Sequence, residues 1–455
     1  MRTISRSALV ALLAALPLGA SPGQSPPIAI VNVSVVPMDR EQVRVGQTVV
    51  VAEGKISAMG PAGTVRVPAG AVRIDGAGRF LMPGLADMHA HFATSGNAAR
   101  DREENEHLAS IFVAHGITTV RSMRGSPEIL ELRQRIDAGH LPGPQVFTTG
   151  PINGASQPNT RRVATVAEAE SLVSADKAAG YDAIKLTNLP PEIYVAFLAA
   201  ARREGLPAYG HVPRPVTFDM AARAGLGSAE HVIPFAVALV PPEAPRAASS
   251  GPASLAPEHA DWSLFPPLAT QLRDSGVWVC PTLVVAERFP NAEKRRRLAD
   301  PTMQYVPRRL RDAWAADVDN ESMGPVPRLL DFGLTLTKRL HEAGVGLLLG
   351  SDDMNPYIVP GVSLHEELAL FVRAGLTPFE ALRAGTRDAA RFLHREREFG
   401  TIAIGRRADL LLLEANPLEN VANARRRAGV MIRGHWFPES DLQRRLRAAA
   451  EAFAK

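Results

Sequence analysis

The sequence predicts an α/β protein in which a closed parallel barrel of eight βα units lies beside a small composite β-domain. Strand-like and helix-like patterns alternate between residues 80 and 395, as in a (β/α)8 barrel. Short β-rich runs without helical periodicity occur at both ends of the chain, each too small to bury a sheet face alone. A chain of 455 residues that is 46% hydrophobic can bury a large core without disulfides.

The first 21 residues have the three-part pattern of a secretory signal peptide. Arg2 and Arg6 precede an apolar run over 8–18, and small residues follow at 19–21. We therefore expect cleavage near Ala20 or Ser21 and export to the periplasm or the medium. No later stretch has eighteen consecutive apolar residues, so no membrane insertion is expected after the signal is removed.

Composition argues against nucleic acid as a partner. The 51 Lys and Arg residues nearly balance 47 Asp and Glu, and aromatic residues make up only 5%. The basic runs at 294–297 and 425–427 are typical of solvated faces. The one cysteine, Cys280, lies in an apolar run and is expected to be a buried thiol.

The two chain ends are predicted to complete one β-domain. Residues 27–79 form its first part and residues 396–440 its second, and a C-terminal helix follows over 441–455. Glu53-Gly54 is expected to be a hairpin turn. The strand patterns of this domain lie at 28–36, 47–52, 55–59, 400–413 and 430–436.

The barrel is predicted over residues 80–395. Two stretches, 234–262 and 284–325, break its rhythm and are interpreted as loop insertions that shape a substrate pocket. Amphipathic helices at 366–372 and 378–393 are expected to close the outer ring. The eight strands are predicted at 80–92, 116–123, 144–149, 181–187, 206–212, 227–233, 277–283 and 344–353. The intervening helices are predicted at 101–115, 126–138, 165–179, 191–204, 216–224, 263–275 and 328–343.

Six metal-binding or ionisable side chains occur near the predicted strand ends, each within an apolar run where an unpaired charge or imidazole is costly. Because side chains alternate along a strand, His89 and His91 are expected to project together. Barrel strands carry their active-site groups at one rim, so the six are expected to meet there. They are His89, His91, Lys185, His211, His231 and Asp352.

Other polar residues near these six are expected to have structural, supporting or substrate-binding roles. By alternation, Asp353 is expected to point to the opposite face of its strand and to have a structural role. By the same argument, Glu230 is expected either to support a metal ligand without binding the metal or to be structural. Arg121, Tyr209 and Arg214 lie near strand ends and are candidates for binding a substrate carboxylate or carbonyl.

Several motifs resemble those of the amidohydrolase superfamily, and in particular its imidazolonepropionase- and prolidase-like branch. They are Met82-Pro-Gly-Leu-Ala-Asp-Met-His-Ala-His91, Ile184-Lys-Leu186, Gly210-His-Val-Pro213, Glu230-His231 and Gly350-Ser-Asp352, with a closing segment over 374–410. The resemblance covers about residues 28–437. It implies a TIM-like (β/α)8 barrel beside a composite β-sandwich, and a hydrolase acting on carbon–nitrogen bonds other than peptide bonds.

The resemblance also implies a ligand set. His89, His91 and Asp352 would bind one metal ion and His211 and His231 a second, bridged by Lys185 after carboxylation by carbon dioxide. Nitrogen and oxygen ligands favour two zinc ions, with manganese, cobalt or iron as alternatives. Asp352 would act as the base toward a metal-activated water, and His231 would help polarise the scissile carbonyl.

The expected substrate is a small molecule with an amide-type C–N bond: a cyclic amide, an N-acyl amino acid or a dipeptide-like compound. The alternatives are an Xaa-Pro-like dipeptidase, a lactonase or phosphotriesterase-like hydrolase on the same site, and an inactive barrel that only binds ligands. A homo-oligomer is left open.

Overall fold

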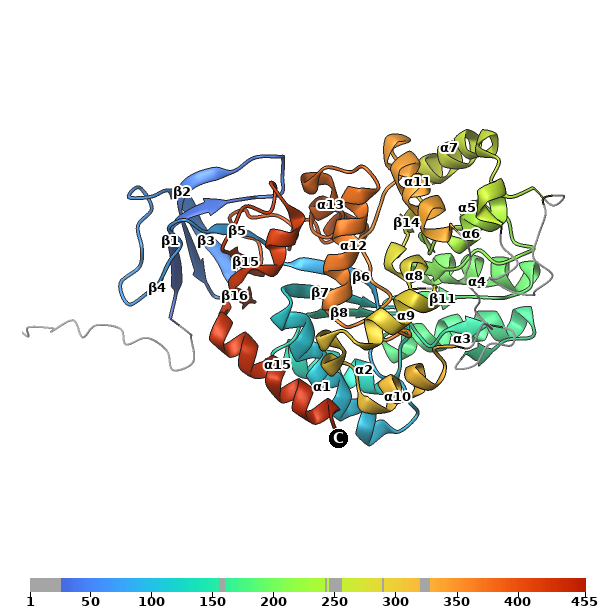
Figure 1. The fold of residues 1–455 in the computed structure, drawn as a ribbon, viewed down its shortest axis with the longest axis horizontal. Coiled ribbons are helices and arrows are strands. Elements are labelled where there is room, and N and C mark those ends of the chain that lie inside the picture. Colours follow the sequence, from blue (N-terminus) through green and yellow to red (C-terminus); the bar gives the residue numbers. More distant parts are fainter. Residues whose placement is uncertain (1–25, 155–159, 242–243, 245–255, 289, 320–327) are drawn as a thin grey trace, which may run out of the picture.

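The computed structural model describes residues 26–154, 160–241, 244, 256–288, 290–319 and 328–455. The expected signal peptide, residues 1–21, lies outside these ranges, as do parts of the two expected insertions. A β-rich region lies at one end of the molecule and a larger α/β region fills the rest (Figure 1). Within the described ranges, no helix is both long and apolar enough to cross a membrane.

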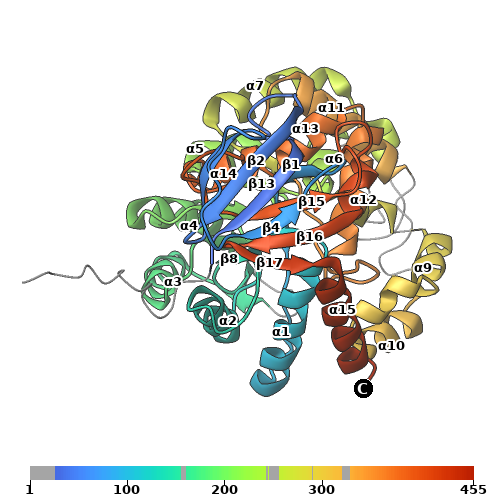
Figure 2. The same ribbon diagram turned by 90° about the vertical axis from the view of Figure 1, so that its left-hand side faces the viewer.

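The β-rich region is one mixed sheet built from both ends of the chain (Figure 2). Its N-terminal strands are β1 (Ile28–Val35), β2 (Arg44–Ala52), β3 (Lys55–Pro61), β4 (Val72–Asp75) and β5 (Phe80–Pro83), and its C-terminal strands are β15 (Leu410–Leu413), β16 (Arg427–Ile432) and β17 (His435–Pro438). Eight strands are hydrogen-bonded in the order β17-β16-β15-β5-β1-β2-β3, with β4 on β1. The composite origin agrees with the prediction, but the strands form a single sheet and not the two separate sheets of a sandwich.

Turn chemistry explains the local pairing in this sheet. Glu53 and Gly54 have φ values of 52° and 74°, which gives the tight turn expected between β2 and β3. The predicted single strand at 430–436 is instead a hairpin, because Arg433 and Gly434 also adopt positive φ. Only 410–413 of the predicted strand 400–413 is regular strand.

The stretch 80–92, predicted as one strand, is two strands in different sheets. β5 ends at Pro83, and β6 (Leu85–Ala90) begins after Gly84 in a parallel sheet. Gly84 donates its backbone N–H to the Asp409 carbonyl at 2.9 Å. A Cβ atom at position 84 would lie 2.1 Å from Thr118 Oγ1, so glycine is required where the chain changes sheets.

The α/β region has a TIM-barrel-like arrangement of parallel strands. One sheet has the order β6-β7-β8, and a second has the order β10-β9-β11-β12-β13-β14. The predicted strand at 344–353 is not a regular strand, but it forms an isolated bridge, Val279 to Leu347, and accepts a hydrogen bond from Met88 N–H at the Leu349 carbonyl. The bounds are β7 (Ile117–Ser122), β8 (Gln145–Thr148), β9 (Asn153–Gly154), β10 (Arg161–Arg162), β11 (Ile184–Leu186), β12 (Ala208–Gly210), β13 (Ser228–Glu230) and β14 (Trp278–Cys280).

Helices cover the outside of these strands (Figure 1). Those close to the predicted positions are α1 (Ala98–Ala114), α2 (Pro127–Asp137), α3 (Val166–Ala179), α4 (Pro191–Glu204), α5 (Phe218–Ala224), α7 (Phe265–Ser275), α11 (Leu329–Glu342) and α12 (Val362–Arg373). The predicted helix 378–393 is split into α13 (Pro378–Ala384) and α14 (Arg387–Phe392). The expected insertions are also partly helical, with α6 (Ile233–Leu239), α8 (Leu283–Glu287), α9 (Asn291–Leu298) and α10 (Arg308–Ala316).

The last helix, α15 (Glu439–Phe453), ties the C-terminus to the α/β region. Its buried residues Leu442, Leu446, Ala449 and Phe453 recur at helical spacing and form one apolar face. This face packs beside α1, and the two helices lie side by side in Figure 2.

Candidate metal centre

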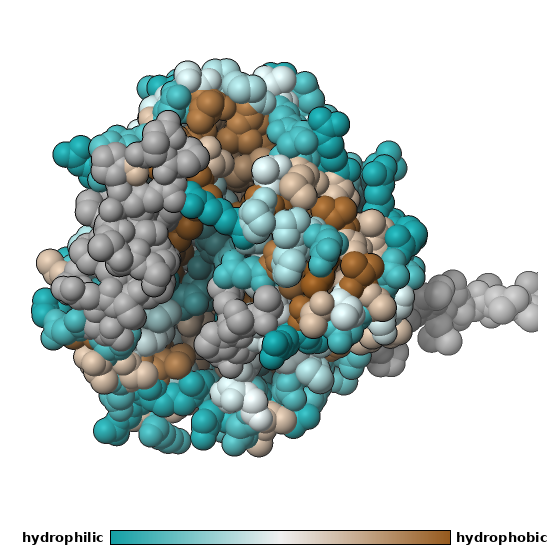
Figure 3. Space-filling view, turned by 90° about the vertical axis from the view of Figure 1, so that its right-hand side faces the viewer, coloured by the Kyte–Doolittle hydropathy of each residue, from teal (hydrophilic) through white to brown (hydrophobic). Residues whose placement is uncertain are grey.

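The parallel strands present their carboxyl ends on the face away from the composite sheet. β6 leaves that sheet at Gly84, so its carboxyl end, with His89 and His91, points to the opposite side. The other parallel strands share this direction. The face opposite the composite sheet is hollowed near its centre, and hydrophilic side chains are visible in the hollow (Figure 3).

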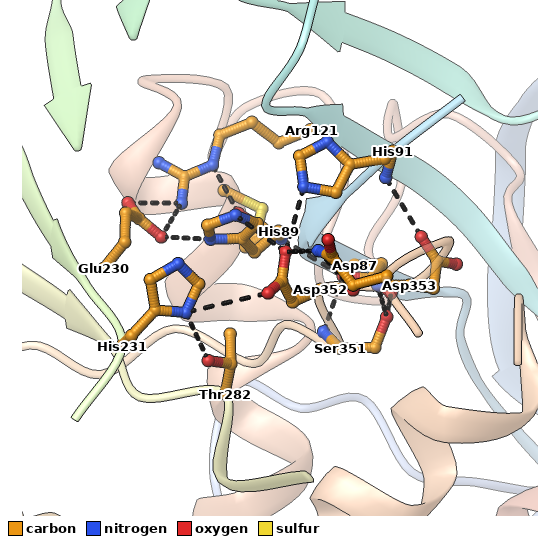
Figure 4. Close-up of polar contacts among 12 residues, drawn as sticks. Asp87, His89, His91, Arg121, Glu230, His231, Thr282, Ser351, Asp352 and Asp353 are labelled. Atoms are coloured by element: carbon orange, nitrogen blue, oxygen red, sulfur yellow. Dashed lines mark hydrogen bonds and ion pairs between the residues drawn. The ribbon is translucent and has the colours of Figure 1, made fainter. Parts of the chain in front are cut away.

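Two histidines and one aspartate converge at this end of the strands (Figure 4). Asp352 Oδ1 lies 2.9 Å from His91 Nε2 and 3.3 Å from His89 Nε2. The second carboxylate oxygen of Asp352 lies 3.9 Å from His231 Nδ1. The His211 ring joins through His231, with ring centroids 4.8 Å apart. Side chains from four separate segments of the chain therefore lie close together here.

Lys185 is the sixth of the residues predicted to form the metal site, and its burial is the most unusual. It is 2% exposed, and its Nζ has no hydrogen-bond partner among the described residues. Burial lowers its pKa to about 8, although the charges of Glu230 and Asp352 act in the opposite direction. A lowered pKa leaves part of the amine neutral, and only a neutral amine can react with carbon dioxide.

The protonation states suit metal binding. Burial lowers the pKa of His89 to about 4 and that of His231 to about 3, and the charge of Lys185 contributes to both shifts. Burial alone would raise the pKa of Asp352, but the neighbouring histidines hold it well below its usual range. At neutral pH the site thus presents neutral imidazoles and an ionised carboxylate, which are the ligand forms that metals bind.

Glu230 contacts a predicted metal ligand, which is one of the two roles expected for it from the sequence. Its Oε2 lies 2.6 Å from His89 Nδ1, and both its oxygens accept hydrogen bonds from Arg121 Nη2, at 3.0 and 3.2 Å. Burial would raise the pKa of Glu230, but Arg121 and His89 outweigh this effect and keep it well below the usual range. The carboxylate therefore accepts the Nδ1 proton of His89 and directs Nε2 toward Asp352.

Strand alternation does not extend to His231, because β13 ends at Glu230. His231 has a φ of 69°, outside any strand conformation, and this lets two consecutive side chains reach the same site. A left-handed residue immediately after a strand leaves no clear signal in the sequence.

The three residues expected to contact a substrate have other surroundings. Arg121 is 1% exposed and donates to Glu230, Ser228 and the Met88 carbonyl, so it is a partner of the site and not a free substrate ligand. Tyr209 lies 4.6 Å below the Arg121 guanidinium and lines a cavity of about 490 Å³ at the amino ends of β12 to β14. Arg214 is exposed and lines an apolar groove beside α5, α6 and α7.

Buried carboxylates hold the segment after residue 349 against β6. Asp353 accepts the backbone N–H of His91 at 3.0 Å, which agrees with its expected structural role. Asp87, not singled out from the sequence, accepts the backbone N–H groups of His89 and Ser351 and the Ser351 hydroxyl at 2.6 Å. These contacts fix the distance between the histidine pair and Asp352.

The donor set fits a divalent metal. His89 Nε2, His91 Nδ1 and Lys185 Nζ are buried and have no hydrogen-bond partner among the described residues. Such groups are costly unless they bind something. His89, His231 and Asp352 offer ligand atoms that all lie within 4.8 Å of one another. Cys280 lies near His89 and Glu230, but burial raises the pKa of its thiol and the Glu230 oxygens are already engaged.

Comparison with known proteins finds a family model and sequence relatives that match parts of this chain. Residues 266–437, which include Asp352, match the model of the Amidohydrolase family. The imidazolonepropionase of Stenotrophomonas maltophilia is 34% identical over 148 residues, which are 30% of this chain and 36% of that enzyme. That of Deinococcus deserti is 43% identical over 86 residues, 19% of this chain and 21% of the relative. The matched segments thus span only about a third or a fifth of these relatives.

Solved structures resemble nearly the whole chain. A prolidase-like protein from Bifidobacterium longum has a TM-score of 0.72 at 24% identity, covering 94% of this chain and all of that one. Bottromycin amidohydrolase has a TM-score of 0.69 at 25% identity, covering 93% and 90% of the two chains. The likeness extends over both the β-rich region and the α/β region.

Proposed function

Because this chain belongs to the amidohydrolase superfamily, we propose that it is a metal-dependent hydrolase that cleaves an amide-type C–N bond of a small molecule. The observation that carries the proposal is the buried cluster of imidazoles around Asp352, with the unpartnered Lys185 among them. We favour a cyclic amide, an N-acyl amino acid or a dipeptide-like compound as the substrate.

His89, His91 and Asp352 would hold one ion and His211 and His231 a second, with carboxylated Lys185 as the shared ligand. Nitrogen and oxygen donors without thiolate favour zinc. When bound, such ions make hydroxide available from water near neutral pH and polarise a carbonyl group. The neutral imidazoles and the charged Asp352 support this assignment, since these are the forms that bind metal.

The protein's own groups would then move the proton. Asp352 is ionised and buried, and it would accept a proton from the attacking water and deliver it to the leaving nitrogen. His231 lies at the same carboxylate and would stand beside the scissile carbonyl. Glu230 and Arg121 would keep His89 in one tautomer throughout.

We also propose that the two parallel sheets close into one (β/α)8 barrel. Thr149 bridges to Ala183 between the sheets on one side. On the other side Val279 bridges to Leu347, and Met88 donates to the Leu349 carbonyl. These contacts support a closed ring in which residues 347–349 take the place of the eighth strand.

Metal removal and restoration test the proposed function. Protein stripped with a chelator should lose hydrolysis of a panel of N-acyl amino acids, cyclic amides, Xaa-Pro dipeptides and lactones, and added zinc should restore it. The substrate cleaved with the highest kcat/KM identifies the class. Activity that survives both chelation and Asp352→Ala would exclude the mechanism.

A further inference from the structure

The turn that follows β14 has an unusual backbone. Thr282, directly before α8, has φ 46° and ψ 56°, a left-handed conformation that β-branched residues rarely adopt. Its side chain is fully buried. A backbone held this way must be fixed by its surroundings.

A distant carboxylate fixes this turn. Glu367 of α12 is fully buried, and its two oxygens accept the backbone N–H groups of Leu283 and Val284, each at 2.8 Å. These are the two residues after Thr282. The described residues form no ion pair with Glu367, so its visible role is to hold the first turn of α8.

The fixed turn places a hydroxyl against the metal centre. Thr282 Oγ1 lies 2.7 Å from His231 Nδ1 (Figure 4). His231 is itself left-handed, and its backbone N–H donates to the Cys280 carbonyl at 2.8 Å. With Nδ1 engaged by a hydroxyl, Nε2 of the neutral ring is the nitrogen left for another ligand.

We propose that Glu367 and Thr282 are positioning residues: Glu367 fixes the left-handed turn, and through it the Thr282 hydroxyl accepts the Nδ1 proton of His231. This hydrogen bond would hold the ring in one tautomer and one orientation, with Nε2 unprotonated. Hydrogen bonds of this kind to a metal-ligating histidine orient the ring and set its basicity. The consequence for metal binding rests on the function proposed above, whereas the effect on His231 does not.

The first experiment uses the metal-free protein. In 15N-histidine NMR the two neutral tautomers give different nitrogen shifts, and the His231 signals are assigned by their loss in His231→Asn. We expect one tautomer in the wild type and in Thr282→Ser, and a mixture in Thr282→Val and in Glu367→Met. The same tautomer in the wild type and in Thr282→Val would overturn the proposal.

The second experiment measures zinc affinity by competition with a chromophoric chelator. Thr282→Val should weaken binding about 10- to 100-fold, as loss of an outer hydrogen-bond partner does, and Thr282→Ser should restore most of it. If Glu367 acts through Thr282, adding Glu367→Met to Thr282→Val should cause little further loss. Fully additive losses would overturn that link.

Two control variants carry the same substitutions, Thr→Val and Glu→Met, at positions that do not contact His231 or the turn at Thr282. Thr337 is a buried threonine in α11 whose hydroxyl has no partner among the described residues, so Thr337→Val should leave zinc affinity unchanged. Glu380 accepts a backbone N–H at the start of α13, so Glu380→Met should lower thermal stability without altering the His231 tautomer. If wild-type protein bound no zinc and cleaved no amide, the proposed function would fail, and the NMR result would still decide the positioning role.

Discussion

The strand β6 and the strand end at β13 both supply two groups to the candidate metal centre, but they do so by different means. On β6, His89 and His91 are two residues apart and share a face, as an extended backbone requires. At β13, Glu230 and His231 are consecutive, and both reach the centre because His231 has a φ of 69°. Alternation thus governs side-chain direction within a strand and fails at the first left-handed residue after it.

Asp352 and Asp353 are also consecutive residues with a left-handed backbone at the first of them, and substituting them should give the largest effect. Asp352 has a φ of 59° and is ionised, whereas burial and nearby Asp87 raise the pKa of Asp353 well above its usual range. Asp352→Asn should reduce kcat/KM by about 10²- to 10⁴-fold with the fold intact, as loss of a general base does. Asp353→Asn, which resembles the neutral acid, should keep most activity. Equal losses in steady-state kinetics would refute the difference between these neighbours.

The next effect concerns Glu230. Glu230→Gln would leave the fully buried guanidinium of Arg121 without its counter-charge, so the free energy of unfolding should fall by about 3–5 kcal/mol. Urea denaturation measures this change. The double variant Arg121→Met with Glu230→Gln should be more stable than Glu230→Gln alone, because no buried charge is left unpaired. A double variant that is less stable would show that Glu230 does not depend on Arg121.

The smallest expected effect is the pH dependence of the free energy of unfolding that arises from His89 and His231. His89 lies within β6, whereas His231 follows the end of β13. Burial lowers the pKa values of His89 and His231 to about 4 and about 3. As the pH falls from about 6.5 toward 4, the unfolded chain binds protons at these imidazoles and the folded protein does not, so the free energy of unfolding falls. His89 should contribute about 3 kcal/mol. Urea denaturation of metal-free protein at several pH values, with His89→Asn as the comparison, checks this; the same slope in both proteins would contradict it.

The sequence predicted the order of strands and helices well because their apolar periodicity is local. The α4 and α3 boundaries, for example, follow from a Pro start and from a Thr165 capping box with Gly180 at the end. The six centre residues were found because each places a polar group in an apolar strand. Asp87 and Thr282 were missed, since their roles depend on contacts with residues far away in the chain or on positive φ.

Arg121 is a residue to which the sequence suggested a role that its contacts in the structure do not support. From the sequence, a cation near a strand end is equally compatible with binding a substrate and with balancing a buried charge. Only the structure shows that its donors are directed inward, to Glu230, Ser228 and the Met88 carbonyl. Its strand, β7, pairs directly with β6, which places the guanidinium within reach of the Met88 carbonyl.

The shared sheet also sets an order of events during synthesis. Pro83 on β5 pairs with Leu410 on β15, so the edge of β5 stays uncovered until almost the entire polypeptide has left the ribosome. The strand that carries His89 and His91 begins immediately after this edge. A nascent chain halted before β15 would therefore present an open strand edge next to the strand that carries His89 and His91.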